Sequence, residues 1–236
     1  MEICNINISC PNLETLLEAT PHLKHIITVN AEAIVRSQKD TRFKNILNTN
    51  TTTIDGEVTL WLYKLKYPKE KINKISGSDL IYDLCNWAEK KQYKIFLLGG
   101  TDISNRESVK VLKKRFNIEI DGYSPPYSPY PFSEDHNKMI ITKIKEFAPD
   151  ILMVGFGMGK QEFWINDNYN ILNQMCIKLA IGCGGTFEFV SGKIKRAPRF
   201  IQKSGLEGVW RLIMEPKLFR IKRLITSFKI FYYFIK

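Results

Sequence analysis

Polar or glycine-rich residues follow four segments that have the composition of buried β-strands. Thr28 and Asn30 close the first segment, and Gly99-Gly100 follow the second. GFGMGKQE at 155–162 follows the third, and GCGG at 182–185 follows the fourth. In an open α/β sheet, ligands bind outside the carboxyl ends of the strands, where glycines let a phosphate approach backbone N–H groups. One such glycine is usually a turn residue, but four such strand ends together predict a ligand that carries a diphosphate.

The third of these segments matches neither common nucleotide-binding motif. Gln161 follows Lys160 where a P-loop has Ser or Thr, and Lys160 occupies the third glycine position of GxGxxG. No two aspartates lie two residues apart, so the sequence has no DxD metal-binding pair. We therefore expect cationic side chains and backbone dipoles to neutralise the diphosphate, with no metal and no cofactor.

The cysteines and the N-terminal residues bear on the compartment. The sequence has three histidines and five cysteines without CxxC spacing, namely Cys4, Cys10, Cys85, Cys176 and Cys183. This argues against a zinc site and favours reduced thiols in a cytosolic protein. The N-terminus lacks a signal-peptide pattern, and no segment approaches the roughly eighteen apolar residues of a membrane span. We expect a cytoplasmic protein.

Asp55-Gly56 follows the polar run at 50–53 and lies at a predicted junction between a loop and a helix. A carboxylate at such a junction is a candidate for chemistry. An isolated Asp-Gly pair is more often a helix N-cap or a turn. The pattern alone therefore favours a structural role.

Short segments rich in Ile and Val alternate with longer amphipathic segments. The patterns predict strands at 25–30, 93–98, 118–123, 150–155 and 177–181, and helices at 31–39, 58–67, 79–91, 105–116, 133–147 and 161–173. This alternation indicates an α/β fold with a Rossmann-like, mostly parallel sheet and helices on both faces. The proline-rich segment 123–131 is predicted to be a surface loop, and His22 and His25 to flank the first strand as structural or exposed residues.

Most of the net positive charge lies near the C-terminus. The net charge is +11, and residues 193–236 hold twelve Lys and Arg against Glu207 and Glu215. Residues 1–192 are therefore nearly neutral. We expect an α/β catalytic domain at 1–192 and a basic amphipathic appendage at 193–236. Apolar residues from Ile221 to Ile235 recur at steps of three and four, which predicts one apolar helical face opposite a basic one.

A basic amphipathic helix with aromatic residues is typical of a helix that lies on an anionic membrane surface. One alternative is a helix that docks on the body and leaves its basic face in solvent. Another is nucleic-acid binding, which a pI near 9.3 permits. The tail aromatics follow the apolar stripe, which argues against nucleic acid. We expect peripheral association with the inner face of the cell membrane.

Seven segments, in this order, resemble the WecG/TagA/CpsF family of bacterial glycosyltransferases. They are TVNAEAI (28–34), IDG (54–56), SGSDL (76–80), IFLLGG (95–100), PDILMVGFGMGKQEFWI (149–165), GCGGTFEFVSGKIKRAP (182–198) and GLEGVWRLIMEP (205–216). The last three are long and distinctive. The resemblance runs from about residue 26 to residue 223.

The resemblance implies an inverting, metal-independent enzyme of cell-surface polysaccharide synthesis, such as teichoic acid, enterobacterial common antigen or capsule. It would transfer N-acetylmannosamine or a related hexose from a UDP-sugar to a polyprenyl-diphosphate-linked acceptor, with Asp55 as the catalytic base. Tail arginines Arg220 and Arg223 would serve membrane binding or complete the active site. The candidate substrate-binding residues are Thr28, Asn30, Lys74, Gly99, Gly100, Gln161, Glu162, Gly184, Gly185, Glu188, Arg196 and Arg211.

Several positions differ from the family's pattern. Gly159 replaces the usual proline before KQE, and Glu188 replaces the commoner aspartate. Lys74 stands where arginine is usual, and a lysine cannot form a bidentate fork with a phosphate. A non-catalytic sugar-nucleotide-binding assembly factor is the alternative function, and a homo-oligomer is compatible with the sequence. The donor sugar and the acceptor stay open.

Overall fold

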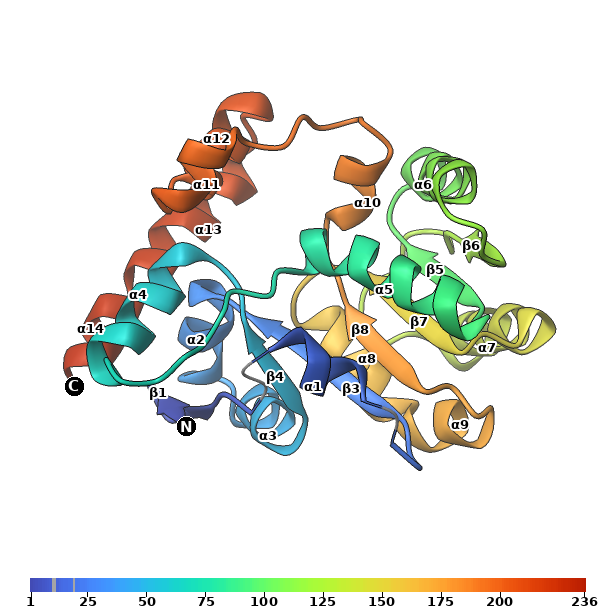
Figure 1. Ribbon diagram of the computed structural model, residues 1–236, viewed down its shortest axis with the longest axis horizontal. Helices are drawn as coiled ribbons and strands as arrows, with labels where there is room; N and C mark the ends of the chain where they lie inside the picture. The colour runs from blue at the N-terminus through green and yellow to red at the C-terminus, as the bar shows by residue number, and fades with distance from the viewer. Residues whose placement is uncertain (10–11, 19) are drawn as a thin grey trace. The chain divides into compact units, whose positions relative to one another are not determined.

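The computed structural model describes residues 1–9, 12–18 and 20–236, with its elements labelled in Figure 1. Cys10 lies outside the described residues. Six strands form one sheet in the order β4-β3-β8-β7-β5-β6. They are β3 (Lys24–Val29), β4 (Thr51–Ile54), β5 (Ile95–Gly99), β6 (Ile120–Tyr123), β7 (Ile151–Gly155) and β8 (Leu179–Gly182). The sheet is parallel and helices surround it, so the predicted α/β class is confirmed.

The chain forms two compact units. The terminal unit comprises Met1–Leu16, Ile27–Ser76 and Ile194–Lys236, and the central unit comprises Leu17–Ile26 and Gly77–Lys193. The division at 192 into a catalytic domain and an appendage stays a prediction.

The helices of the central unit are α5 (Gly77–Lys91), α6 (Asp102–Arg115), α7 (Glu134–Phe147), α8 (Lys160–Asp167), α9 (Tyr169–Gln174) and α10 (Thr186–Val190). Those of the terminal unit are α2 (Ala31–Ser37), α3 (Thr41–Thr49), α4 (Glu57–Lys66), α11 (Arg199–Lys203), α12 (Glu207–Met214), α13 (Leu218–Phe228) and α14 (Ile230–Ile235). Near the N-terminus, β1 (Glu2–Ile3) and β2 (Ile6–Asn7) pair antiparallel, and α1 (Leu13–Leu17) follows them.

The inner strands β5, β7 and β8 of the central unit are buried on both faces. Alternate side chains such as Leu98, Leu152 and Val154 form one cluster with residues of α7, α8 and α9, including the fully buried Trp164. The intervening side chains, such as Met153, are equally inaccessible to solvent. Burial on both faces is the reason that these strands are apolar along their whole length.

Two predicted elements differ from the observed ones. The helix expected over 161–173 is broken at Asn168, which separates α8 from α9. The Asn168 amide group donates to the Trp164 carbonyl at 2.8 Å and its side-chain oxygen accepts from Asn137 at 2.8 Å. The predicted tail helix is likewise broken at Lys229, between α13 and α14. The proline-rich segment expected to be a loop contains neither helix nor strand over 124–131.

The strand β4 was not predicted, because its sequence TTTI is mostly polar. Thr52 and Thr53 are nevertheless buried. The Thr52 hydroxyl donates to the Asn7 carbonyl at 2.6 Å, and the Thr53 hydroxyl donates to the Ile75 carbonyl at 3.1 Å. These hydrogen bonds satisfy the hydroxyls, and β-branched threonine then suits a strand.

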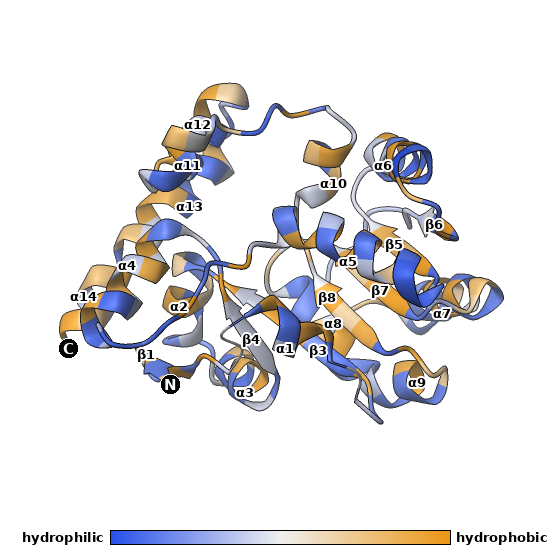
Figure 2. Cartoon of the chain, viewed as in Figure 1, coloured by the Kyte–Doolittle hydropathy of each residue, from blue (hydrophilic) through white to orange (hydrophobic). Residues whose placement is uncertain are grey.

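Much of the apolar face of α13 is exposed to solvent. On α13, Leu218, Ile221, Ile225 and Phe228 are exposed, whereas Arg223 on the same helix pairs with Glu32 of α2. Figure 2 shows the hydrophobic residues along α12 to α14. Lys222 and Lys229 are also exposed and Ile230 of α14 is buried, so the alternative of a helix that docks on the body and leaves its basic face in solvent stays open. None of the helices in the described ranges combines the length and hydrophobicity of a membrane-crossing segment.

His25 lies near the start of β3 and is only 2% exposed, so of the two expected alternatives it is structural and not exposed. Neither of its ring nitrogens has a hydrogen-bond partner among the described residues. Burial lowers the pKa of its imidazole from 6.5 to about 3. The folded protein therefore holds this side chain neutral.

We predict that His25 makes the protein less stable in mild acid. Below pH 6.5 the imidazole of His25 is protonated in the unfolded chain. In the folded chain it stays neutral down to about pH 3. Stability should therefore fall by about 2 kcal/mol between pH 7 and pH 5 from this group alone. Urea unfolding at both pH values should show this loss in the wild type and in the exposed control His22→Leu, but not in His25→Leu. An equal loss in His25→Leu would contradict the assignment.

Candidate active site

Asp55 lies directly after β4 and is fixed by the neighbouring strand. Its backbone N–H donates to the Val29 carbonyl, the last residue of β3, at 2.8 Å. Gly56, not Asp55, occupies the N-cap position of α4, with a positive φ of 82° that favours glycine. Asp55 is half-buried. Asp55 is therefore not the N-cap residue of α4 but the first residue after β4.

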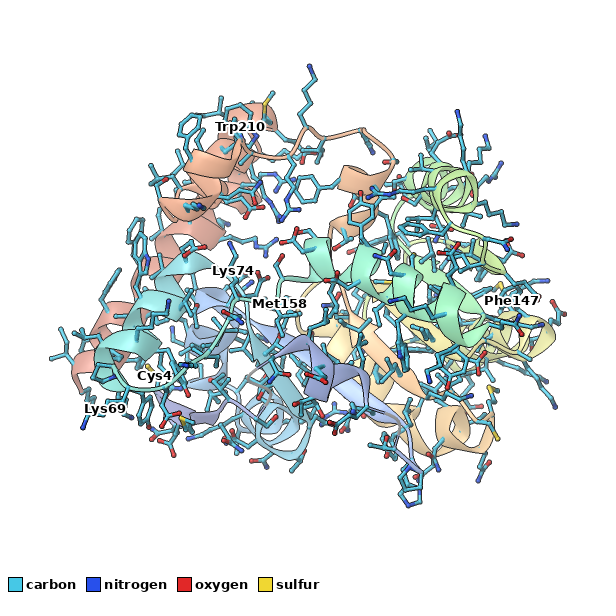
Figure 3. All side chains as sticks on the ribbon, viewed as in Figure 1. Cys4, Lys69, Lys74, Phe147, Met158 and Trp210 are labelled. Atoms are coloured by element: carbon cyan, nitrogen blue, oxygen red, sulfur yellow. The ribbon has the colours of Figure 1, made fainter. Side chains whose placement is uncertain are left out.

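Lys74 is held beside the same strand end. Ile75 donates its N–H to the Ile54 carbonyl at 2.8 Å, which extends the chain alongside β4. The Lys74 ammonium, labelled in Figure 3, lies 2.7 Å from a carboxylate oxygen of Glu57 in a largely buried ion pair. Glu57 offsets the positive charge of this ammonium. The pair of Lys74 and Glu57 therefore has little net charge with which to attract a phosphate.

Arg211 of α12 lies within the electrostatic reach of Asp55. Burial lowers the pKa of the Arg211 guanidinium, and the carboxylates of Glu207 and Asp55 act in the opposite direction. The guanidiniums of Arg223 and Arg220 add to the lowering. We call Asp55, Arg211, Arg220 and Arg223 the Asp55–arginine cluster. All four residues belong to the terminal unit.

Each arginine of this cluster has a carboxylate partner. Arg211 lies 3.2 Å from Glu207, one turn away on α12. Arg220 pairs with Glu215, which Lys217 also contacts.

Arg223 lies 2.6 Å from Glu32 in the first turn of α2. This ion pair joins residues that are 191 positions apart and ties the C-terminal helix α13 to the helix that follows β3. Carboxylates thus offset the repulsion between neighbouring guanidiniums.

Thr28 and Asn30 end β3 in the same unit. The Asn30 side-chain oxygen accepts from the Ala33 N–H at 3.0 Å and caps α2. Thr28 is half-buried. The predicted residue Arg196 lies between α10 and α11 and is also half-buried.

In the central unit, Gln161 joins the loops that follow β7 and β8. Its side-chain oxygen accepts from the Gly157 N–H at 3.1 Å and from the Gly184 N–H at 3.0 Å. Its amide group donates to Glu162 at 2.8 Å. Glu162 in turn accepts from the Gly159 N–H at 2.5 Å. Both side chains are buried, so they fix two glycine-rich strand ends in one arrangement.

Gly99 and Gly100 are enclosed by aromatic rings that the sequence patterns did not reveal. A Cβ on Gly99 would lie 2.8 Å from the Phe156 ring, and one on Gly100 would lie 2.9 Å from the Phe187 ring. The Gly100 N–H donates to the Gly155 carbonyl at 3.0 Å. In this structure the two glycines therefore allow close packing, and the Gly100 amide is already bonded.

The last predicted group surrounds the start of α10. Gly184 has a positive φ of 53° and open space where a Cβ would be. Gly185 lies against Glu188, whose carboxylate oxygen would be 3.3 Å from an added Cβ. Thr186 donates its hydroxyl to the Cys183 carbonyl at 2.6 Å. Burial, Glu188 and Glu162 raise the pKa of the Cys183 thiol, which is therefore unreactive.

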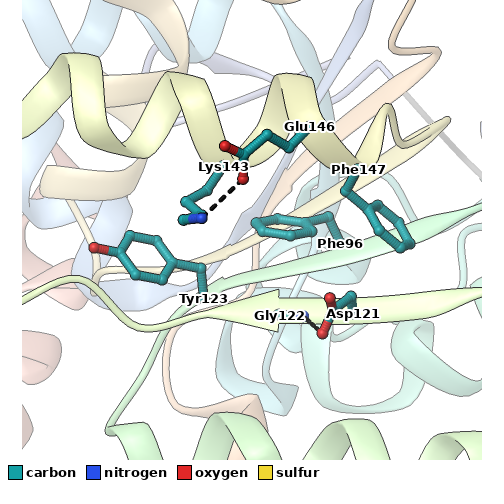
Figure 4. Close-up of a pocket in the computed structure, with 7 residues that line it drawn as sticks. All are labelled: Phe96, Asp121, Gly122, Tyr123, Lys143, Glu146 and Phe147. Carbon is teal, nitrogen blue, oxygen red and sulfur yellow. Dashed lines mark hydrogen bonds and ion pairs between the residues drawn. The ribbon is translucent and has the colours of Figure 1, made fainter.

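A separate cavity of about 230 Å³ lies between β6 and α7 of the central unit (Figure 4). Its lining includes Phe96, Tyr123 and the ion pair of Lys143 and Glu146. None of the predicted site residues lines it.

The structure thus assembles the predicted residues into two groups, one in each unit. The Asp55–arginine cluster combines a carboxylate with cations that bind anions. The group around Gln161 fixes glycine-rich loops. Within the described part of the chain, no three or more His, Cys, Asp and Glu residues are arranged to hold a metal ion.

The α/β fold carries an aspartate after a strand and three arginines in its terminal unit. The family model described as glycosyl transferase WecG/TagA/CpsF matches residues 1–236, and the chain belongs to this family. It is therefore a glycosyltransferase. The family acts in cell-surface polysaccharide synthesis, with a sugar-nucleotide donor and a lipid-linked acceptor in general.

We predict that Gln161→Leu destabilises the fold. The leucine leaves the partly buried N–H groups of Gly157 and Gly184 without their acceptor, which costs about 1–3 kcal/mol in total. Urea unfolding of this variant should show that loss. Gln174→Leu, an exposed glutamine of α9, is the matched control and should change stability by less than about 0.5 kcal/mol. Equal stability of the two variants would show that Gln161 does not fix the loops.

Proposed function

We propose that this glycosyltransferase moves N-acetylmannosamine or a related hexose from a UDP-sugar to a polyprenyl-diphosphate-linked sugar, with inversion and without a metal. The grouping of Asp55 with Arg211, Arg220 and Arg223 carries this proposal. The Asp55 carboxylate can accept a proton, and the Arg211 guanidinium that interacts with it can bind a diphosphate.

Asp55 is the general base in this proposal. The acceptor hydroxyl attacks the anomeric carbon from the face opposite the UDP group, so the C–O bond forms as the bond to the diphosphate breaks. Asp55 takes the proton of the hydroxyl. The position of Asp55 supports this role, because its backbone is bonded to Val29 while Gly56 supplies the N-cap of α4.

The arginines stabilise the leaving diphosphate. Negative charge grows on UDP as the glycosidic bond breaks, and fixed cations lower the free energy of that state. Guanidinium groups bind phosphate oxygens through two parallel hydrogen bonds. Arg211 supports this role through its interaction with Asp55, and the pairing of Arg211 with Glu207 and of Arg223 with Glu32 keeps these arginines oriented before substrate binds.

The exposed apolar face of α13 contacts the membrane that holds the lipid-linked acceptor. Four apolar side chains of this helix face solvent, and the neighbouring residues Lys217, Lys222 and Lys229 are exposed cations. Apolar insertion combined with attraction to anionic lipid is how interfacial helices bind. This supports a peripheral location on the inner face of the cell membrane.

We predict that Asp55→Asn loses turnover by about 10²–10⁴-fold, the usual contribution of a general base. Binding of the UDP-sugar should persist, because the asparagine keeps the size of the side chain. Mass spectrometry of the product, with a short-chain polyprenyl-diphosphate-linked acceptor and EDTA present, measures turnover, and calorimetry measures binding.

The exposed Asp135→Asn is the matched control for this variant and should keep wild-type turnover. Near-normal turnover of the Asp55→Asn variant would exclude Asp55 as the general base. Absence of product from the wild type, with UDP-sugar binding intact, would favour a non-catalytic binding protein. Wild-type turnover that requires a divalent cation would contradict the metal-independent mechanism.

We predict that Ile225→Ser/Phe228→Ser weakens binding to anionic vesicles by about tenfold or more, because two apolar side chains no longer enter the lipid. Vesicle co-sedimentation measures this. Ile103→Ser/Val111→Ser, on exposed positions of α6, is the control and should bind as the wild type does. Equal binding by both variants would remove α13 from the membrane contact.

A further inference from the structure

The helix α4 presents a second apolar face to solvent, far from the tail in sequence. Trp61 is 48% exposed and Leu65 is 71% exposed, whereas the intervening Leu62 and Tyr63 are buried. Trp61 and Leu65 are four residues apart and therefore lie on one side of the helix. The burial of Leu62 and Tyr63 stabilises the fold. Trp61 and Leu65 make no such contribution because they face solvent, and this exposed apolar pair indicates a contact with something outside the chain.

This face is continuous with the apolar surface of the C-terminal helices. The turn between α11 and α12 packs on α4, because a Cβ on Gly205 would lie 3.2 Å from the Trp61 ring and 3.4 Å from Val58. Leu206, the next residue, is 52% exposed. The apolar surface thus runs from α4 across this turn into α12.

Lysines surround the exposed face of α4. Lys64, Lys66, Lys69 and Lys71 are all exposed, and Glu70 is the acidic residue among them. Glu57, at the start of the helix, is paired with Lys74. An apolar face with a basic rim complements an anionic lipid surface, whereas the same lysines on a second copy of the chain would repel it.

We propose that α4 is a second membrane-contact element, in which Trp61 and Leu65 enter the headgroup region of an anionic bilayer beside the C-terminal helices. The proposal rests on the membrane contact of the proposed function. Tryptophan is suited to that depth, because its ring is apolar and its N–H can reach water. Two contacts far apart in sequence orient the terminal unit better than one. Since α4 begins directly after Asp55-Gly56, the element that meets lipid also orients the base.

The test uses the full chain carrying Trp61→Ser/Leu65→Ser and vesicles of phosphatidylcholine with or without phosphatidylglycerol. Co-sedimentation with the anionic vesicles should weaken by about tenfold or more, because two apolar side chains no longer enter the lipid. Ile103→Ser/Val111→Ser on α6 is the matched control and should bind like the wild type. Circular dichroism and the midpoint of urea unfolding serve to check that the variant is folded.

Turnover with a water-soluble acceptor analogue separates this inference from the proposed function. The Trp61→Ser/Leu65→Ser variant should keep that turnover, because neither side chain belongs to the Asp55–arginine cluster. If the variant binds anionic vesicles as strongly as the wild type does, the role of α4 is overturned and the tail contact is left intact. No binding by the wild type would overturn both membrane contacts but not the enzymatic proposal. Loss of a dimer in the variant, with vesicle binding unchanged, would assign the face to a second copy.

Discussion

Neighbouring guanidinium groups repel one another unless carboxylates offset their charge, and this constraint organises the terminal unit. Arg220 and Arg223 lie close enough to Arg211 to lower the pKa of its guanidinium, and Asp55 acts on that pKa in the opposite direction. Three glutamates on α12, α2 and the segment before α13 balance the remaining charge. The unit therefore holds three guanidinium groups whose mutual repulsion is offset by carboxylates, and in the proposed function the diphosphate binds to these guanidiniums.

The same constraint explains the orientation of the C-terminal helix. Because Arg223 is drawn inward to Glu32, the opposite face of α13 must point away from the protein, and that face is apolar. An exposed apolar stripe in water is unfavourable and is common where a protein meets a membrane or a partner. Charge pairing near Asp55 and the proposed membrane contact are thus two consequences of one helix orientation.

The sequence predicted most of the fold because most strands are apolar throughout and alternate with amphipathic helices. It missed β4, where threonine hydroxyls find partners only in the folded chain, and it left open whether His25 is structural or exposed, whereas the structure buries it. The family resemblance singled out Asp55. It could not show that Lys74 is neutralised by Glu57, or that Glu32 pairs with Arg223, since these contacts join residues far apart in sequence.

The central claim is that Asp55 and Arg211 act on one reacting centre, as the base and the stabiliser of the leaving diphosphate. A double-mutant cycle in kcat/KM with Asp55→Asn and Arg211→Lys tests it most directly. Residues that act as a unit are strongly non-additive. The account predicts that the double variant is hardly slower than the slower single variant. Losses that multiply, as for two independent sites, would contradict it.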